Sequence, residues 1–157
     1  MYEMKTILIF LTFLFLGNPK SFHQDTPLKI DKKGNIIGLP KQFGPAKFDL
    51  VSKKLRIKDK EVVFPKCLCY YFEQHQNPKV YLSASWYHEK RFLPYYLNFT
   101  IVDKHVNYEY TILINLETLT LIEVSKSTME GNTIHSPKVE LGEKCLTDYN
   151  NGISVEN

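Results

Sequence analysis

The sequence lacks the short motifs through which many enzymes bind nucleotides or activate a nucleophile. It contains no G-x-G-x-x-G or G-x-x-x-x-G-K loop, no G-x-S-x-G elbow and no S-x-x-K pair, so these routes to nucleotide binding and acyl transfer have no support. Its histidines form no H-x-H or H-x-x-x-H pair, and its two neighbouring cysteines are spaced C-x-C. These spacings predict no metal site and no cofactor.

A strong excess of positive charge is also missing, since the formal net charge is only +3 over 157 residues. The nearest approach to a basic patch is SKKLRIKDK, residues 52–60. Its basic residues alternate with Leu55 and Ile57, which is typical of the solvent face of a strand. Because nucleic-acid binding needs several phosphate contacts from a basic stripe, we expect no nucleic-acid partner.

Long hydrophobic runs are absent except near the start of the chain. Residues 7–16, ILIFLTFLFL, follow Lys5, and a run of this length is too short to span a bilayer, which needs about 20 residues. A basic start followed by a short apolar core is typical of a secretory signal. We therefore predict a signal peptide over residues 1–24, a single domain over residues 25–157, no membrane span after cleavage, and a secreted or periplasmic location.

The remainder of the chain is dominated by two-residue alternation of apolar and polar side chains. Alternating runs occupy residues 79–89, 95–103, 107–115 and 116–124, after a hairpin at 29–37 with Asp31 and Gly34 in its turn. No long segment repeats apolar residues at the spacing of three and four that a helix needs. Residues 126–138 have the composition of a loop, and Val139 and Leu141 suit a last strand. The C-terminal end is expected to fray. The pattern predicts an all-β protein, an antiparallel meander forming a sandwich or small barrel of about seven to nine strands.

The three cysteines are the candidates for a disulfide. Cys67 and Cys69 lie in the aromatic stretch FPKCLCYYF, residues 64–72, where a strand would place both on one face. In an exported protein a bridge from one of them to Cys145 is favoured. Three buried free thiols, and a metal or redox site, are the alternatives.

Aromatic residues offer the best candidate for recognition, because the chain holds 10 tyrosines and 10 phenylalanines. In the run 79–89, one face presents Tyr81, Ser83, Ser85 and Tyr87, which suit contact with a protein, a carbohydrate or another small molecule. The sequence therefore predicts an exported binding or interaction module without recognisable catalytic machinery.

Two other functions fit the same sequence. A small secreted hydrolase would gather acids and histidines in space, and the candidates for such a cluster are His75, His88, Asp103 and His105. An envelope accessory domain with a structural role is the other alternative.

Overall fold

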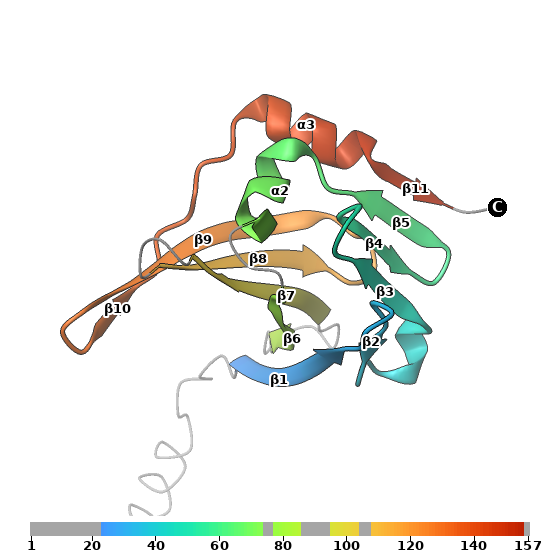
Figure 1. The fold of residues 1–157 in the computed structure, drawn as a ribbon, viewed down its shortest axis with the longest axis horizontal. Helices are drawn as coiled ribbons and strands as arrows, with labels where there is room; N and C mark the ends of the chain where they lie inside the picture. The colour runs from blue at the N-terminus through green and yellow to red at the C-terminus, as the bar shows by residue number, and fades with distance from the viewer. Residues whose placement is uncertain (1–22, 74–76, 86–94, 104–107, 156–157) are drawn as a thin grey trace, which may run out of the picture.

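The computed structural model describes residues 23–73, 77–85, 95–103 and 108–155. One antiparallel sheet has seven strands in the order β10-β9-β8-β7-β6-β1-β2 (Figure 1). Its members are β1 (His23–Ile30), β2 (Ile36–Ile37), β6 (Lys79–Ser85), β7 (Tyr95–Val102), β8 (Glu109–Asn115), β9 (Leu121–Glu130) and β10 (Thr133–His135).

A second antiparallel sheet has four strands in the order β11-β5-β4-β3. It consists of β3 (Ala46–Asp49), β4 (Lys54–Ile57), β5 (Lys60–Val63) and β11 (Ile153–Val155). The described strands do not close into a barrel. The predicted all-β antiparallel class is confirmed, and the number of strands exceeds the prediction because β2, β10 and β11 have only two or three residues each.

The two sheets meet at one corner, where the turn after β1 approaches β3. Asp31 accepts hydrogen bonds from the amides of Lys33 and Asn35 at 2.8 and 2.9 Å, so the predicted turn is confirmed. Gly34 has a φ of 84°, and its carbonyl accepts the amide of Phe48 at 2.8 Å. A side chain at Gly34 would lie 2.6 Å from the Phe48 carbonyl oxygen, so only glycine fits this close approach.

Alternation in the longer strands places one set of side chains between the sheets. The fully buried members of this set include Leu97, Phe99 and Ile101 of β7 and Ile112 and Ile114 of β8. Phe48 of β3 reaches across to Phe99, with ring centroids 4.8 Å apart. These contacts confirm the predicted two-residue pattern for β7 and for the second half of β8.

Residues 66–73 form a helix, α2 (Lys66–Glu73), where the sequence suggested a strand. Leu68, Tyr71 and Phe72 are its buried residues, and their spacing of three and four is the short stripe that a helix needs. Phe72 packs against Phe48 and Phe99, with centroid distances of 5.1 and 5.6 Å. The strand interpretation was wrong because these aromatic residues, which favour strands in general, pack here across one helical face.

The C-terminal part of the chain is also ordered, where fraying was expected. It forms α3 (Glu143–Asn151) and then β11, which pairs with β5. Figure 1 shows α3 beside α2 on the same side of the strands. A disulfide between Cys67 and Cys145 joins the two helices, with Cα atoms 6.1 Å apart. The predicted bridge to Cys145 is thus present, and it starts from Cys67.

The change from strand to helix explains why Cys69 does not share the direction of Cys67. Residues two apart on a helix point about 200° apart, because each residue turns the helix by about 100°. Cys69 is a free, half-buried thiol whose Sγ donates to the Phe64 carbonyl at 3.2 Å. Burial raises the pKa of this thiol, which makes the reactive thiolate scarcer.

Tyr149 of α3 secures the helix to the turn between β8 and β9. The side chain is fully buried, and its hydroxyl donates to the Leu119 carbonyl at 2.6 Å. Leu119 is itself buried and has a φ of 60°, the left-handed region that leucine rarely adopts. Burial also raises the pKa of Tyr149, so the hydroxyl stays protonated as a donor.

Two further expectations near β9 were wrong. Residues 126–138 are not a loop, since they contain the end of β9 and all of β10, and residues 139–141 form no strand. A bulge also shifts the register, because Leu113 faces Glu123 while Ile114 faces Leu121. The extra residue, Ile122, is therefore turned outward and is 47% exposed, whereas Val124 is buried.

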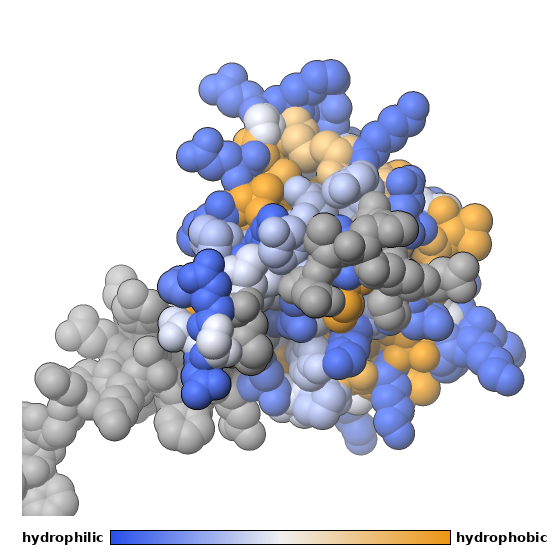
Figure 2. Space-filling model, turned by 60° about the vertical axis from the view of Figure 1, so that its left-hand side comes forward, coloured by the Kyte–Doolittle hydropathy of each residue, from blue (hydrophilic) through white to orange (hydrophobic). Residues whose placement is uncertain are grey.

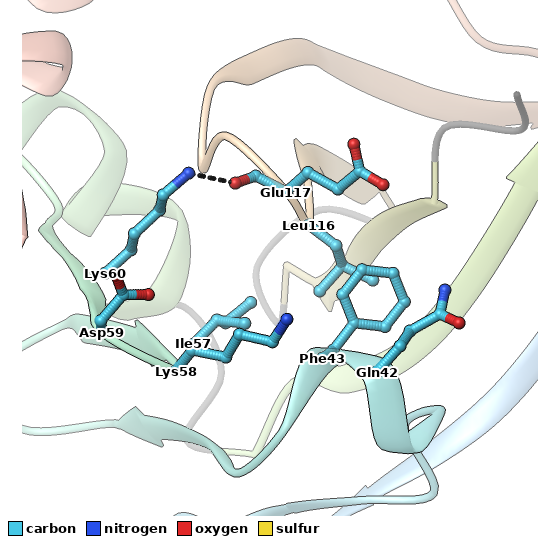
Figure 3. A pocket seen from close by; sticks show the side chains of 8 residues that line it. All are labelled: Gln42, Phe43, Ile57, Lys58, Asp59, Lys60, Leu116 and Glu117. Carbon is cyan, nitrogen blue, oxygen red and sulfur yellow. Dashed lines mark hydrogen bonds between the residues drawn. The ribbon is translucent and has the colours of Figure 1, made fainter.

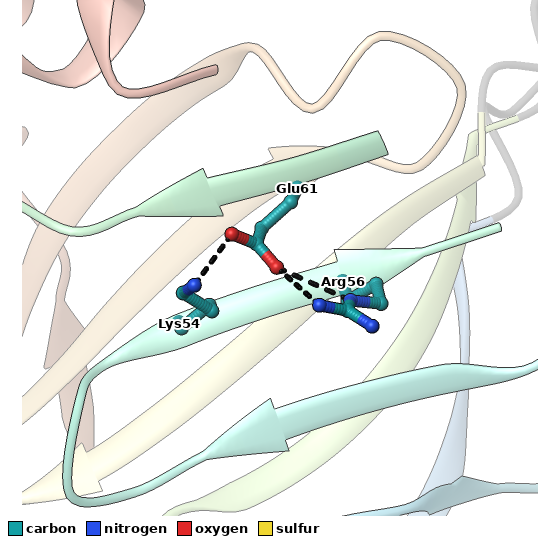
Figure 4. A network of polar contacts seen from close by, with 3 residues as sticks. All are labelled: Lys54, Arg56 and Glu61. Atoms are coloured by element: carbon teal, nitrogen blue, oxygen red, sulfur yellow. Dashed lines mark hydrogen bonds and ion pairs between the residues drawn. The ribbon is translucent and has the colours of Figure 1, made fainter. Parts of the chain in front are cut away.

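The outer face of the four-stranded sheet carries a compact ion-pair network (Figure 4). Glu61 lies opposite Arg56 in the β4–β5 pairing and accepts hydrogen bonds from its guanidinium at 2.7 and 3.1 Å. Lys54 pairs with the other carboxylate oxygen at 2.6 Å. Hydrogen bonds from Lys54 and then Arg56 lower the pKa of Glu61. The predicted solvent face of this strand is confirmed for Lys54 and Arg56.

Replacement of Tyr149 by Phe tests the attachment of α3. Loss of the hydroxyl leaves the buried Leu119 carbonyl without its donor, so we expect the free energy of unfolding to fall by about 1–2 kcal/mol. Urea denaturation measures it. Tyr70→Phe is the matched control, because Tyr70 is 51% exposed; equal losses in both variants would contradict the assignment.

The Glu61 network predicts a specific dependence of stability on pH. Because the folded pKa of Glu61 is lowered, the carboxylate stabilises the fold above its unfolded pKa of about 4.3, and this contribution is lost as the pH falls below that value. Glu61→Gln should therefore cost stability at pH 7 and progressively less toward pH 3. Urea titrations at both pH values measure the difference, with exposed Glu140→Gln as control. If Glu61→Gln costs as much stability at pH 3 as at pH 7, the proposed role of the Glu61 carboxylate is wrong.

Candidate functional site

The tyrosine and serine row suggested by the sequence is only partly described. Tyr81 is half-buried in β6 and lies between Pro27 of β1 and Asn98 of β7. Ser83 is 1% exposed, and its hydroxyl donates to Asp25 Oδ1 at 2.5 Å. The side chain of Ser85 and all of Tyr87 fall outside the described residues. Recognition by this row stays a prediction, and the burial of Ser83 leaves it little room to contact a partner.

The sheet adds a tyrosine that the sequence analysis did not include. Tyr96 of β7 lies opposite Ser83 in the pairing with β6, and it is half-buried. Because directly opposite residues point to the same face, Tyr81, Tyr96 and Asn98 share the outward side of the sheet. We refer to these three residues as the outer tyrosine face.

The remaining sequence candidates do not gather into a catalytic or metal-binding cluster within the described part of the chain. His75, His88 and His105 lie outside it, while Asp103 is buried after β7. Among the described residues, no group of three or more His, Cys, Asp or Glu side chains is close enough to hold a metal ion. No described helix is long and apolar enough to cross a membrane.

A pocket of about 360 Å³ lies where the two sheets come together on the side of the β4–β5 turn (Figure 3). Three apolar side chains form its floor: Phe43 of the short 3-10 helix η1 (Lys41–Phe43), Ile57 of β4, and Leu116 after β8. All three are at most 3% exposed. The Phe43 ring packs edge-to-face against Tyr95, with ring centroids 5.2 Å apart.

Polar and charged side chains surround this floor: Gln42, Lys58, Asp59, Lys60 and Glu117. Lys60 Nζ donates to the Glu117 carbonyl at 2.5 Å, so one wall of the pocket is tied to the other. Figure 3 shows the Lys58 ammonium extending toward Phe43 and Leu116, while the Glu117 carboxylate points away from it. An apolar floor with a few polar groups around it is typical of small-ligand sites.

The backbone around Lys58 is unusual. Ile57 pairs with Lys60, so Lys58 and Asp59 form a two-residue turn. Lys58 has a φ of 55°, where glycine is normally preferred. A Cβ on Gly44 would lie 3.2 Å from Lys58 Cγ, so the lysine stem packs against this glycine. Strain of this kind is more common at functional sites than elsewhere.

The β8–β9 turn holds Leu116 and Glu117 at the pocket. The Asn115 carboxamide accepts the amides of Glu117 and Thr118 at 2.8 and 3.1 Å. The Leu116 amide donates to the Tyr95 carbonyl at 2.9 Å. Because Tyr149 binds the Leu119 carbonyl in the same turn, this wall of the pocket depends on the position of α3.

No sequence motif marks this pocket, because its lining comes from three separate segments, residues 42–43, 57–60 and 116–117. Within each short segment the residues follow ordinary turn and strand patterns. A lysine in a two-residue hairpin turn is unusual, but it can be recognised only when the strand register is known.

No protein-family model, curated protein or solved structure matches this chain. The geometry of the described residues is therefore the basis for a functional proposal.

Lys58→Gly tests whether the turn is strained. Glycine adopts a positive φ without the steric cost of about 1–2 kcal/mol that other residues bear, although it adds flexibility to the unfolded chain. We expect a net gain of about 0.5–1 kcal/mol in the free energy of unfolding, measured by urea denaturation. Asp59→Gly, at the neighbouring position of the same turn, should destabilise the protein. A loss of stability in Lys58→Gly would contradict this interpretation.

Proposed function

We propose that the protein is a binding module that holds a small, partly apolar molecule in the pocket formed by η1, the β4–β5 turn and the β8–β9 turn. The observation that carries this proposal is the combination of three buried apolar side chains at the floor with charged groups at the mouth. The volume, about 360 Å³, falls within the range of about 300–1,000 Å³ for ligand pockets.

Reversible binding fits the pocket better than turnover. None of its described lining residues is a serine, threonine, cysteine or histidine, and these side chains supply most nucleophiles and many general bases. The surface also offers little to a large hydrophobic partner on the side seen in Figure 2. Hydrophilic side chains predominate there, apart from the atoms drawn in grey, and the hydrophobic ones form separate patches.

The place of action in this proposal is outside the cytoplasm, in the periplasm or medium. The Cys67–Cys145 bridge supports it, because disulfides persist mainly in oxidising compartments. The apolar run at residues 7–16 supports it as well.

A second candidate function is contact with a protein or carbohydrate through the outer tyrosine face. It is supported by the half-buried Tyr81 and Tyr96 on the same side of β6 and β7. Tyrosine combines a broad apolar ring with a hydroxyl, which suits such contacts. The pocket of the main proposal lies elsewhere, at η1 and the β4–β5 and β8–β9 turns, so the two candidates use different surfaces.

Blocking the pocket mouth tests the main proposal. Benzyl alcohol, a neutral ring-sized probe, should shift the backbone amide NMR signals of Phe43, Lys58 and Leu116 in a saturable way. Gln42→Trp places a large side chain at the mouth and should reduce the probe's affinity by about tenfold or more, because the ring loses contact with the apolar floor.

Lys41→Trp is the matched control, since Lys41 is exposed on the same 3-10 helix but does not line the pocket. It should bind the probe as the unchanged protein does. Absence of saturable shifts in the unchanged protein, or equal affinity in Gln42→Trp, would refute small-molecule binding at this pocket.

A further inference from the structure

The charged groups at the mouth of the pocket are not equally available to a ligand. Lys60 already donates to the Glu117 carbonyl. The Lys58 ammonium forms no hydrogen bond or ion pair with any other described residue. Lys60 keeps its charge and its other two donors, but it is held at the Glu117 wall, whereas the Lys58 ammonium extends over the floor of the pocket (Figure 3).

The position of this ammonium is constrained by the backbone and by Gly44. Lys58 has a φ of 55°, and its stem extends from the turn toward Phe43 and Leu116 (Figure 3). The contact between Gly44 and Lys58 Cγ, at 3.2 Å from an added Cβ, supports the stem from below. A side chain held in this way loses less conformational entropy on binding than a free surface lysine.

The acidic groups nearby do not occupy the same space. In Figure 3 the Glu117 carboxylate points away from Lys58, and the Asp59 carboxylate lies on the side of Lys60. Of the two lysines around the pocket, Lys58 is therefore the one whose ammonium lies over the apolar floor, while Lys60 lies beside Glu117. A ligand with an anionic head and an apolar body would match both features.

We infer that the pocket selects small carboxylates, whose anionic group pairs with Lys58 and whose apolar body lies against Phe43, Ile57 and Leu116. This inference rests on the proposed function and specifies its ligand class. Lys58 is exposed, so its ion pair alone adds little affinity, and the selectivity depends on one ligand contacting both the ammonium and the apolar floor.

Three probes of nearly equal shape test the inference: benzoate, benzamide and benzamidinium, which are anionic, neutral and cationic. Each is titrated into the unchanged protein while the amide signals of Phe43, Lys58 and Leu116 are followed. We expect benzoate to bind about fivefold more tightly than benzamide, and benzamidinium to bind most weakly. Added salt should weaken the binding of benzoate and leave the affinity for benzamide unchanged.

Variants of Lys58 assign the preference to its charge. Lys58→Met keeps the length and apolar stem, and it should make benzoate and benzamide bind equally. Lys58→Arg retains a positive charge and should keep the preference. Lys41→Met, which removes a nearby charge from outside the pocket, should also keep it. Loss of the preference in Lys41→Met would mean that general surface charge is responsible, and the inference would fail.

The outcomes separate this inference from the function on which it rests. If benzamide and benzoate bind equally to the unchanged protein, or benzamidinium binds best, the pocket is a ligand site but carboxylate selection is wrong. If none of the three probes perturbs the pocket, the proposed function itself fails. Preference for benzoate that survives in Lys58→Met would also overturn the inference.

Discussion

The fold depends on holding two helices over a core that the sheets leave open on one side. The sheets meet near the turn after β1, and Phe48, Phe72 and Phe99 fill the space between them with rings about 5–6 Å apart. Neither helix is long, and short helices derive their stability from packing instead of intrinsic propensity. The bridge from Cys67 to Cys145 joins them covalently, so that α2 and α3 cover the core as one unit.

This constraint reaches the proposed ligand pocket through Tyr149. Its hydroxyl holds the turn that carries Leu116 and Glu117, and Lys60 fastens the same turn to the small sheet. The pocket therefore has walls from both sheets, fixed by contacts that do not involve the ligand. Such preorganisation lowers the entropic cost of binding.

The sequence predicted those features that follow from local spacing. Alternation in β7 identified Leu97, Phe99 and Ile101 because a strand with one buried face repeats every two residues. It failed for α2, where only three buried residues in eight mark the helix, and for Ile122, which a bulge turns outward. The sequence could not show which of Cys67 and Cys69 bonds to Cys145, because that choice depends on the helix α2, which was not predicted. The pocket could not be predicted from the sequence, because only the tertiary fold brings Lys58, Phe43 and Leu116 together.

The joining of α2 to α3 can be tested by mapping the disulfide in the native protein. The unreduced protein is unfolded with thiols alkylated, digested, and examined by mass spectrometry. We expect a cross-linked pair of peptides containing Cys67 and Cys145, with the alkyl label on Cys69. Separation of Cys67 from Cys69 needs a cut at Leu68, or fragmentation of the linked peptide between them. A bridge that uses Cys69, or label on all three cysteines, would contradict the joining of α2 to α3 on which the fold and the pocket depend.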